Sequence, residues 1–312
     1  MADTPQPHAC EHAGGDNASG VYLISPSSAI ESPDALDVAC RQLRMQGFAT
    51  AVDEAALARH QRFAGTDEVR LAAIARSLEQ PLPIVLSARG GYGITRLLER
   101  IDWDRVAASG KWFVGHSDFT AFNLALLART GAISYAGPSA VPDFGVESPD
   151  PLTCALFGET LRGELEILSF DAPGADAVDA RGTLWGGNLA MLCSLVGTPW
   201  LPQVDGGLLF LEDVGEHPYR IERMLAQLWH AGILQRQQAI LLGRFTGYRL
   251  GEHDRGYDLP EVWQWLRRRT GLPVVPGLPY GHVPGKATLP VGAHVGLAVE
   301  DDTAWLVLHE HD

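Results

Sequence analysis

The chain has 312 residues, a length typical of about two domains. Hydrophobic residues make up 46% of it and charged residues 20%, which excludes intrinsic disorder for most of the chain. Lys and Arg number 24 against 38 Asp and Glu. The net charge of −14 excludes broad binding of nucleic acid or anionic membranes, so an anionic ligand would need a local basic group.

Residues 1–20 form a polar N-terminal extension, for which we expect disorder. They lack the basic and apolar regions of a secretory signal, and no later stretch reaches the ~20 apolar residues that span a bilayer. His8, Cys10 and His12 alternate here, but no fourth ligand or rigid frame accompanies them, so we expect no metal site. The four cysteines of the chain are widely spaced, which is typical of a reduced protein, and we expect a cytoplasmic one.

Residues 21–145 alternate predicted strands and helices. Short apolar runs predict strands at Val21–Ser25, near Phe48–Val52, at Ile84–Ser87 and at Trp112–Val114. Caps and apolar stripes predict helices from Ser32 to Gly47, from Thr66 with Leu71, Ile74, Ala75 and Leu78 on one face, over 94–101, and from Phe119 to Gly131. Such β-α units predict an α/β domain with a mostly parallel sheet, helices on both faces, and functional groups at the carboxyl ends of the strands.

The rest of the chain has a different pattern. Residues 146–181 lose the β-α rhythm and are rich in Pro, Gly, Asp and Ala, which is typical of an inter-domain linker. Residues 182–312 predict a smaller C-terminal α+β domain, with strands at Gly207–Glu212, Ala239–Phe245 and Thr303–Leu308 and a helix at Pro218–His230.

Ser117 lies between a predicted strand and a predicted helix, two residues after Gly115. This arrangement resembles a nucleophile elbow, although the segment GHSDF does not match G-x-S-x-G. A serine in such a turn faces the helix N-terminus, whose amides stabilise developing negative charge. A purely N-capping serine is the alternative.

A glycine-rich turn, Arg89–Gly93, follows the neighbouring strand. A phosphate loop is disfavoured because no Lys-Ser/Thr follows and the G-x-G-x-x-G spacing is absent. An oxyanion hole, formed by the amide of Gly90 or Gly91 together with that of Asp118, fits the turn better. A tight β-α turn without a ligand is the alternative.

A serine nucleophile needs a base, and the base needs an orienting acid. His282 is a candidate base because it lies in a glycine-lined loop after a predicted strand, whereas His116 adjoins Ser117 and should point away from it. Glu212 and Asp213 end a predicted strand, so one carboxylate emerges at its end. Either one is instead a candidate cap for the following helix.

Together these segments resemble the LD-carboxypeptidases, a family of serine peptidases that cleave murein tetrapeptides. The resemblance covers nearly the whole chain from Val21 and rests on ARGGYGITRLL, GHSDFTAFNLALL, GTLWGGNLAMLCSLVGTPW, LEDVGEHPYRIERMLAQLWHAGIL and the later GH and LPVGAH. It implies that Ser117 is the nucleophile, His282 the base and Glu212 the acid, with the oxyanion hole as above. It also implies two domains with the active site between them, and a homodimer.

The resemblance further implies that the chain hydrolyses the bond before the terminal D-alanine in peptidoglycan recycling, through an acyl-enzyme and without a metal or other cofactor. Arg89 is the candidate cation for the carboxylate of this peptide substrate, with a structural surface arginine as the alternative. Trp185 is a candidate pocket wall, with a core position as the alternative.

Two other functions remain open at this stage. A related branch of the family hydrolyses peptidyl- or aminoacyl-nucleotide antibiotics and confers self-immunity, although the shorter chain and the segment GTLWGGNLAML favour the murein branch. A non-catalytic ligand-binding module on the same scaffold would not need a nucleophile, a base and an acid together, and all three candidates are present.

Overall fold

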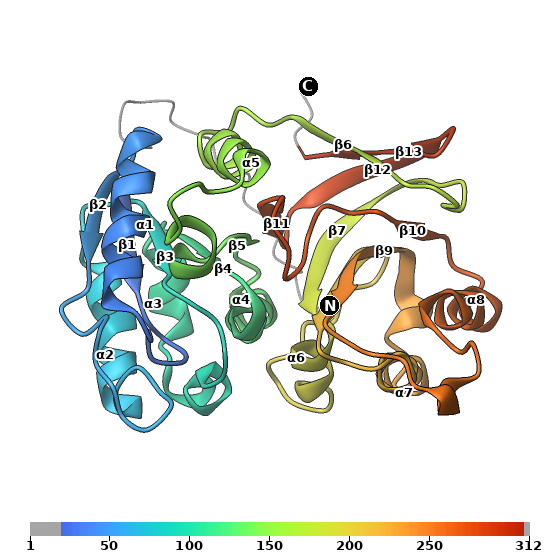
Figure 1. The fold of residues 1–312 in the computed structure, drawn as a ribbon, viewed down its shortest axis with the longest axis horizontal. Helices are drawn as coiled ribbons and strands as arrows, with labels where there is room; N and C mark the ends of the chain where they lie inside the picture. Colours follow the sequence, from blue (N-terminus) through green and yellow to red (C-terminus); the bar gives the residue numbers. More distant parts are fainter. Residues whose placement is uncertain (1–19, 309–312) are drawn as a thin grey trace, which may run out of the picture.

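The computed structural model describes residues 20–308, in which the chain forms two halves, each built on one β-sheet (Figure 1). The first sheet has the strand order β11-β5-β4-β3-β1-β2 and the second β10-β9-β8-β7-β12-β13-β6. The first contains β1 (Gly20–Ile24), β2 (Ala49–Val52), β3 (Ile84–Ser87), β4 (Trp112–Gly115), β5 (Ser134–Ala136) and β11 (Leu289–Val291). Strands β1 to β5 are parallel and β11 is antiparallel to β5, so the prediction of a mostly parallel sheet is confirmed.

Helices cover both faces of the first sheet, as predicted. Alternate residues of β1 point to opposite faces, so Val21 and Leu23 join one hydrophobic cluster while Tyr22 and Ile24 join another. Residues of α1 (Pro33–Met45) and α5 (Pro151–Leu161) pack in the first cluster. Residues of α2 (Asp67–Leu78), α3 (Trp103–Ala108) and α4 (Thr120–Thr130) pack in the second.

The face predicted for helix α2 contacts the core, since Ile74 is buried and Leu71 and Leu78 pack against the same cluster, but the helix also buries two polar residues that the pattern did not indicate. The buried residues are Arg70, Ala73, Ile74 and Ser77, while Leu71, Ala75 and Leu78 are only half-buried. Arg70 can be buried there because its guanidinium donates to the carbonyls of Pro26 and Gly93 and to Asp67. A buried arginine whose two terminal nitrogens have partners is tolerated in a core, and a hydrophobic pattern cannot reveal it.

The helix predicted over 94–101 is wrong in type. The segment forms two 3-10 turns, Ile94–Arg96 and Leu98–Arg100, and α3 follows with Asp102 accepting a hydrogen bond from the amide of Arg105. The apolar side chains of the segment are buried as predicted. The amide of Ile94 is held by the carboxylate of Asp118, and this contact replaces an ordinary helix start.

The segment predicted as a linker, residues 146–181, contains α5 and β6 (Ile167–Asp171), and β7 begins at Asp179. Helix α5 packs on the first sheet, whereas β6 is an edge strand of the second. In the other direction, β11 comes from the second half of the chain and completes the first sheet. The two halves therefore exchange elements.

The second sheet combines parallel and antiparallel strands. Strands β7 (Asp179–Asn188), β8 (Gly207–Val214), β9 (Gln237–Thr246) and β10 (Val274–Pro276) are parallel, and β12 (His294–Glu300), β13 (Thr303–Val307) and β6 are antiparallel. The helices of this half are α6 (Leu189–Ser194), α7 (Pro218–His230) and α8 (Leu259–Thr270), and the predicted bounds of α7 are confirmed. One hydrophobic cluster runs from α4 into this sheet, so the halves share a core. Within residues 20–308, no helix has the length and apolar character needed to cross a membrane.

Candidate active site

Ser117 begins a short 3-10 turn (Ser117–Phe119) directly after β4, and its backbone has φ of +61°. Outside glycine this left-handed conformation costs about 1–2 kcal/mol and is concentrated at functional sites. Gly115 permits the turn, because a Cβ there would lie 2.4 Å from the ring of Phe119. The turn projects a strained, half-buried serine from the carboxyl end of a parallel strand.

The glycine-rich turn after β3 packs against this serine. A Cβ on Gly90 would lie 2.8 Å from Cβ and 3.2 Å from Oγ of Ser117, so any side chain there would cover the hydroxyl. Gly91 has φ of +106°, and a Cβ on it would collide with the hydroxyl of Ser28. Within the described residues, the amides of Gly90 and Gly91 donate no hydrogen bond to the protein. They are therefore free to bind a ligand oxygen.

The side chain of Asp118 has a structural role. It is fully buried and accepts hydrogen bonds from Ser27 Oγ at 2.7 Å and from the amide of Ile94 at 3.0 Å. Burial raises the pKa of this carboxyl group, and the hydrogen bonds oppose that effect. The side chain ties the serine turn to the turns that follow β1 and β3, which leaves only the backbone amide of Asp118 as a candidate oxyanion donor.

Glu212 and His282 come together, although they lie 70 residues apart in the sequence. Nδ1 of His282 lies 2.8 Å from Oε2 of Glu212, a distance at which a protonated Nδ1 donates a hydrogen bond. The Glu212 side chain is fully buried, whereas the His282 side chain is 25% exposed. A buried carboxylate therefore orients an imidazole whose other nitrogen is available for proton transfer.

His116 connects this pair to the serine turn. Its ring centroid lies 4.3 Å from that of His282, and its Nε2 lies 3.9 Å from Oε1 of Glu212. Burial, helped by the charges of Lys286 and His282, holds the pKa of His116 well below its usual value, so this ring is neutral at neutral pH. Sequence reasoning gave His116 no contact within the site, because a contact with two distant residues leaves no local signal.

His116 thus precedes Ser117 in the chain and contacts His282 through its ring. In the part of the chain that is described, Ser117 Oγ has no hydrogen-bond partner. The acid–base contact is formed in this state and the serine–base contact is not. Catalytic hydrogen bonds of this kind often tighten only when substrate binds.

Asn188 links Glu212 to Asp213 by hydrogen bonds. Asn188 Nδ2 donates to Oε1 of Glu212 at 3.1 Å and to Oδ1 of Asp213 at 2.9 Å. Oδ2 of Asp213 accepts from the amide of Ala190, in the first turn of α6. Of the two adjacent carboxylates, Glu212 therefore contacts His282, and Asp213 caps a helix. The capped helix is α6, which precedes β8, whereas the sequence pattern pointed to the helix that follows β8.

Asp213 should make stability depend on pH. Burial raises its carboxyl pKa from 3.8 to about 6, although amide donors oppose the shift. A raised acid pKa means that the folded state binds more protons, so the contribution of Asp213 is complete below pH 4 and is lost as the pH rises through about 6. We expect this loss to be about 3 kcal/mol in the free energy of unfolding. Denaturant unfolding of the wild type and of Asp213→Asn at pH 4, 5, 6 and 7 measures it. The difference in unfolding free energy between the wild type and the variant should change over that pH range. A difference that stays constant with pH would contradict the assignment.

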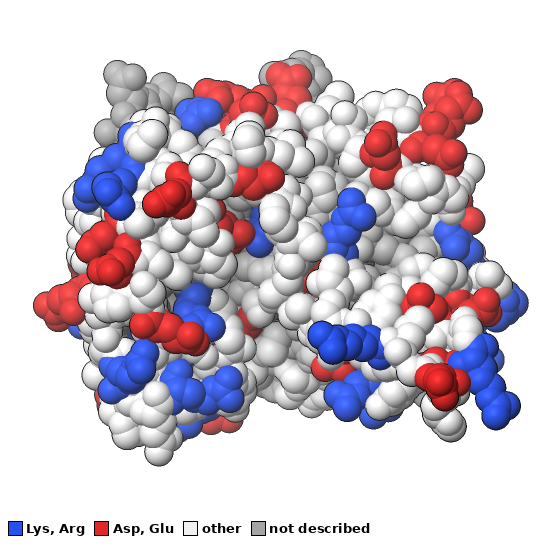
Figure 2. Space-filling model, in the orientation of Figure 1, with Lys and Arg blue, Asp and Glu red and all other residues white. Residues whose placement is uncertain are grey.

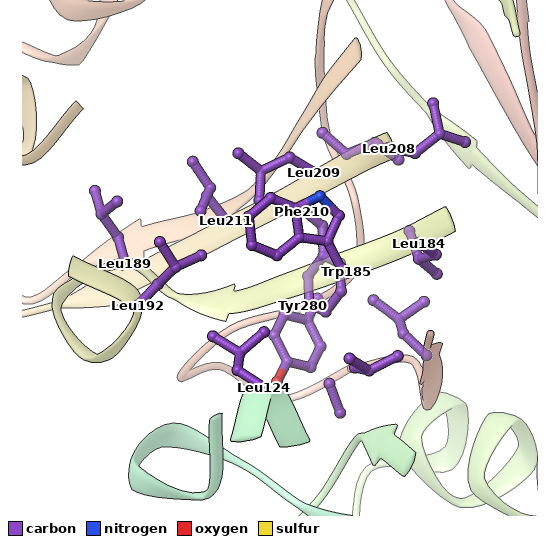
Figure 3. Packing of buried hydrophobic residues seen from close by; sticks show 14 of the residues in the cluster. Leu124, Leu184, Trp185, Leu189, Leu192, Leu208, Leu209, Phe210, Leu211 and Tyr280 are labelled. Carbon is purple, nitrogen blue, oxygen red and sulfur yellow. The ribbon is translucent and has the colours of Figure 1, made fainter. Parts of the chain in front are cut away.

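The two candidate substrate-binding residues, Arg89 and Trp185, differ in how accessible they are. Arg89 Nη1 donates to the carbonyl of Ala29 and lies 3.1 Å from the carboxylate of Glu31, which is 83% exposed. This pair is solvated and therefore weak. Trp185 is 1% exposed, donates through Nε1 to Gln237 and packs among buried side chains of β8 (Figure 3). The prediction of a pocket wall is wrong for Trp185, because a side chain without accessible surface cannot line a pocket.

Potential metal ligands also converge at this place. His116, Glu212 and His282 form the one group within residues 20–308 that offers three potential ligand atoms, all within 4.8 Å of one another. The atoms of Glu212 and His282 are hydrogen-bonded to each other in this arrangement. The pair is set up for proton transfer, which is the chemistry that an adjacent serine requires.

On the face shown in Figure 2, the surface is hollowed between the two halves, and charged groups of both signs border the hollow. A separate cavity of about 350 Å³ lies between α2 and residues 100–106 and is lined by apolar and basic side chains. None of the candidate catalytic residues lines it, so it is not the active site.

Comparison with known proteins matches the two halves to the two different domains of one family. A family model of the LD-carboxypeptidase N-terminal domain matches residues 21–137, and a model of the C-terminal domain matches residues 181–297. The crystal structure of a muramoyltetrapeptide carboxypeptidase from Oxalobacter formigenes is 42% identical, with a TM-score of 0.88 over 94% of this chain and 99% of that one.

Two curated proteins are also similar. A murein tetrapeptide carboxypeptidase of Pseudomonas aeruginosa is 32% identical over 87% of this chain and 91% of its own length. A microcin self-immunity protein of Escherichia coli is 29% identical over 70% of this chain and 71% of its own length. The chain thus resembles members of both branches that the sequence left open.

Proposed function

The chain belongs to the LD-carboxypeptidase family of serine peptidases, and from that premise we propose that it removes the terminal D-alanine of murein tetrapeptides in peptidoglycan recycling. The observation that carries the proposal is the hydrogen-bonded pair of Glu212 and His282, which contacts His116, the residue before Ser117. This is the acid–base pair that a serine nucleophile requires.

The first half of the reaction forms an acyl-enzyme. Ser117 Oγ attacks the carbonyl carbon between the third residue and D-alanine, and its proton passes to Nε2 of His282. The carboxylate of Glu212 stabilises the resulting imidazolium through Nδ1–H. Negative charge on the tetrahedral oxygen is stabilised by backbone amides, for which Gly90, Gly91 and Asp118 are the candidates. His282 then gives its proton to the amine of D-alanine as the carbon–nitrogen bond breaks.

The second half releases the tripeptide. Water attacks the ester carbonyl, His282 takes a proton from this water, and the carbon–oxygen bond to Ser117 breaks as Oγ regains a proton. Throughout the cycle His116 stays neutral because its pKa is far below neutrality. The positive charge therefore resides on His282, where Glu212 stabilises it.

Substrate choice is tested with the wild-type chain. We expect release of D-alanine from a murein tetrapeptide with a kcat/KM at least about 100-fold above that for hydrolysis of an aspartyl sulfamoyl adenosine. Measurement of released D-alanine and of free nucleoside gives both rates. The reverse preference would favour the self-immunity branch, to which the similarity with the microcin self-immunity protein points.

A chelator tests for a metal in the same assay. Activity that EDTA abolishes would indicate a metal at the group formed by His116, Glu212 and His282.

Two further expectations from the sequence belong to the same proposal. The chain should act as a homodimer in the cytoplasm, where tetrapeptides from cell-wall turnover would be its substrates. Light scattering of the purified protein tests the oligomeric state, and fractionation of the cells tests the location.

A further inference from the structure

The carboxyl ends of three neighbouring parallel strands bring a cation close to the acid–base pair. Strands β7, β8 and β9 are adjacent and parallel, so their carboxyl ends lie at one edge of the sheet. Asn188 ends β7, Glu212 lies near the end of β8, and Arg244 lies near the end of β9. Ligands of sheets of this kind bind at that edge.

Arg244 contacts the loop that carries His282. Its amide donates to the carbonyl of Tyr280 at 2.8 Å, and a Cβ built on Gly281 would lie 3.0 Å from Cβ of Arg244. The neighbouring Gly243 leaves room for this loop, because a Cβ there would lie 2.4 Å from the carbonyl oxygen of Tyr280 and 3.3 Å from Cβ of Glu212. The side chain of Arg244 therefore starts beside the segment that positions the base.

Other cations near the site already have partners. The buried Nζ of Lys286 lies 2.7 Å from Oδ1 of Asp143, and the buried Arg70 is bonded to Asp67 and to two carbonyls. Arg89 is bonded to Ala29 and paired with an exposed glutamate.

Arg244 differs from these three. It is exposed, and within residues 20–308 its guanidinium makes no hydrogen bond, ion pair or aromatic contact. An accessible guanidinium without a partner is suited to bidentate binding of a carboxylate. Because the chain carries a net charge of −14, an anionic substrate needs such a group close to the reacting bond.

We propose that Arg244 is a specificity residue that binds a carboxylate of the peptide substrate next to His282. The proposal rests on the proposed function, since it concerns recognition of the same substrate. A tetrapeptide with diaminopimelate as its third residue offers two such groups on the residues that flank the reacting bond, the carboxylate of its terminal D-alanine and the carboxylate of the diaminopimelate side chain. The α-carboxylate of its γ-linked D-glutamate lies one residue farther from that bond.

The first test is kinetic. For Arg244→Gln we expect kcat/KM on the tetrapeptide to fall about 10- to 100-fold, mainly through KM, because a charge-assisted bidentate contact is lost. Arg244→Lys should recover part of this loss, since it restores the charge without the fork. Arg41→Gln is the matched control, an exposed arginine on α1 in the other half of the molecule, and should behave as wild type. Equal kinetics of Arg244→Gln and Arg41→Gln would overturn the proposal.

The second test identifies the carboxylate. One substrate has a C-terminal amide in place of the terminal carboxylate, and another has lysine in place of diaminopimelate. On the substrate that lacks the bound carboxylate, the wild type and Arg244→Gln should have the same kcat/KM, and on the other they should still differ. A full difference on both modified substrates would show that Arg244 binds neither carboxylate beside the reacting bond and would overturn the proposal. If the wild type cleaves no tetrapeptide at all, the proposed function itself fails, and that result is distinct from these.

Discussion

Replacing Ser117 with alanine is expected to lower the release of D-alanine from a tetrapeptide by a factor on the order of 10⁴ or more. Without the hydroxyl no acyl-enzyme forms, and the acid–base pair has no nucleophile to activate. Alanine keeps the Cβ and adopts the same backbone conformation as serine at φ of +61°, so stability should change little. Turnover of the purified variant, with circular dichroism and thermal unfolding beside it, measures both quantities.

Ser194→Ala is the matched control for this experiment. Ser194 lies at the end of α6, is exposed, and donates its hydroxyl hydrogen bond to the carbonyl of Met191. Its loss should leave turnover unchanged. Retained turnover in a folded Ser117→Ala variant would eliminate Ser117 as the nucleophile.

Replacing Glu212 with glutamine is expected to reduce kcat by about 10³- to 10⁴-fold. The neutral amide cannot stabilise the imidazolium of His282, and it presents either an oxygen or an NH₂ group to Nδ1. Glutamine fills the space of the fully buried glutamate, so the effect should appear in kcat and not as unfolding. Steady-state kinetics over pH 5 to 9 measures it.

Two comparisons make the result specific. Glu222→Gln changes a half-buried carboxylate of α7 that accepts a hydrogen bond from Tyr257, and it should leave kcat unchanged. The double variant of Ser117→Ala and Glu212→Gln should be no slower than Ser117→Ala alone, because residues that act as a unit are not additive. A Glu212→Gln variant with normal kcat, or additive losses, would remove Glu212 from the triad.

Much of the first half could be predicted from local pattern. The apolar stripe of α1 corresponds to the residues that are buried, and β3 and β4 lie where their apolar runs place them. Gly115 and Ser117 mark a turn between strand and helix, and the strained serine is found there. These features depend on residues within one turn or one strand of each other, so the chain encodes them locally.

Features that involve a polar core residue were harder to predict. The burial of Arg70 on α2 depends on carbonyl partners that lie on two other loops. The short turns over 94–101 depend on the carboxylate of Asp118. For Trp185 both a pocket wall and a core position were open, and its indole is buried and bonded to Gln237. In each case a distant partner overrides the local pattern.

By itself, the sequence determined the types of chemistry available: a serine in a strand–turn–helix, a histidine in a glycine-lined loop, and two adjacent acids at a strand end. The local pattern left both acids open and the family resemblance named Glu212, whereas the physical reason for that choice lies in the tertiary structure. Glu212 and Asp213 are chemically alike, but the β8–β9 pairing has a register shift between Leu211 and Asp213. The carboxylate of Glu212 reaches His282, and that of Asp213 reaches the start of α6. That choice arises from contacts between segments far apart in the chain, which no local pattern contains.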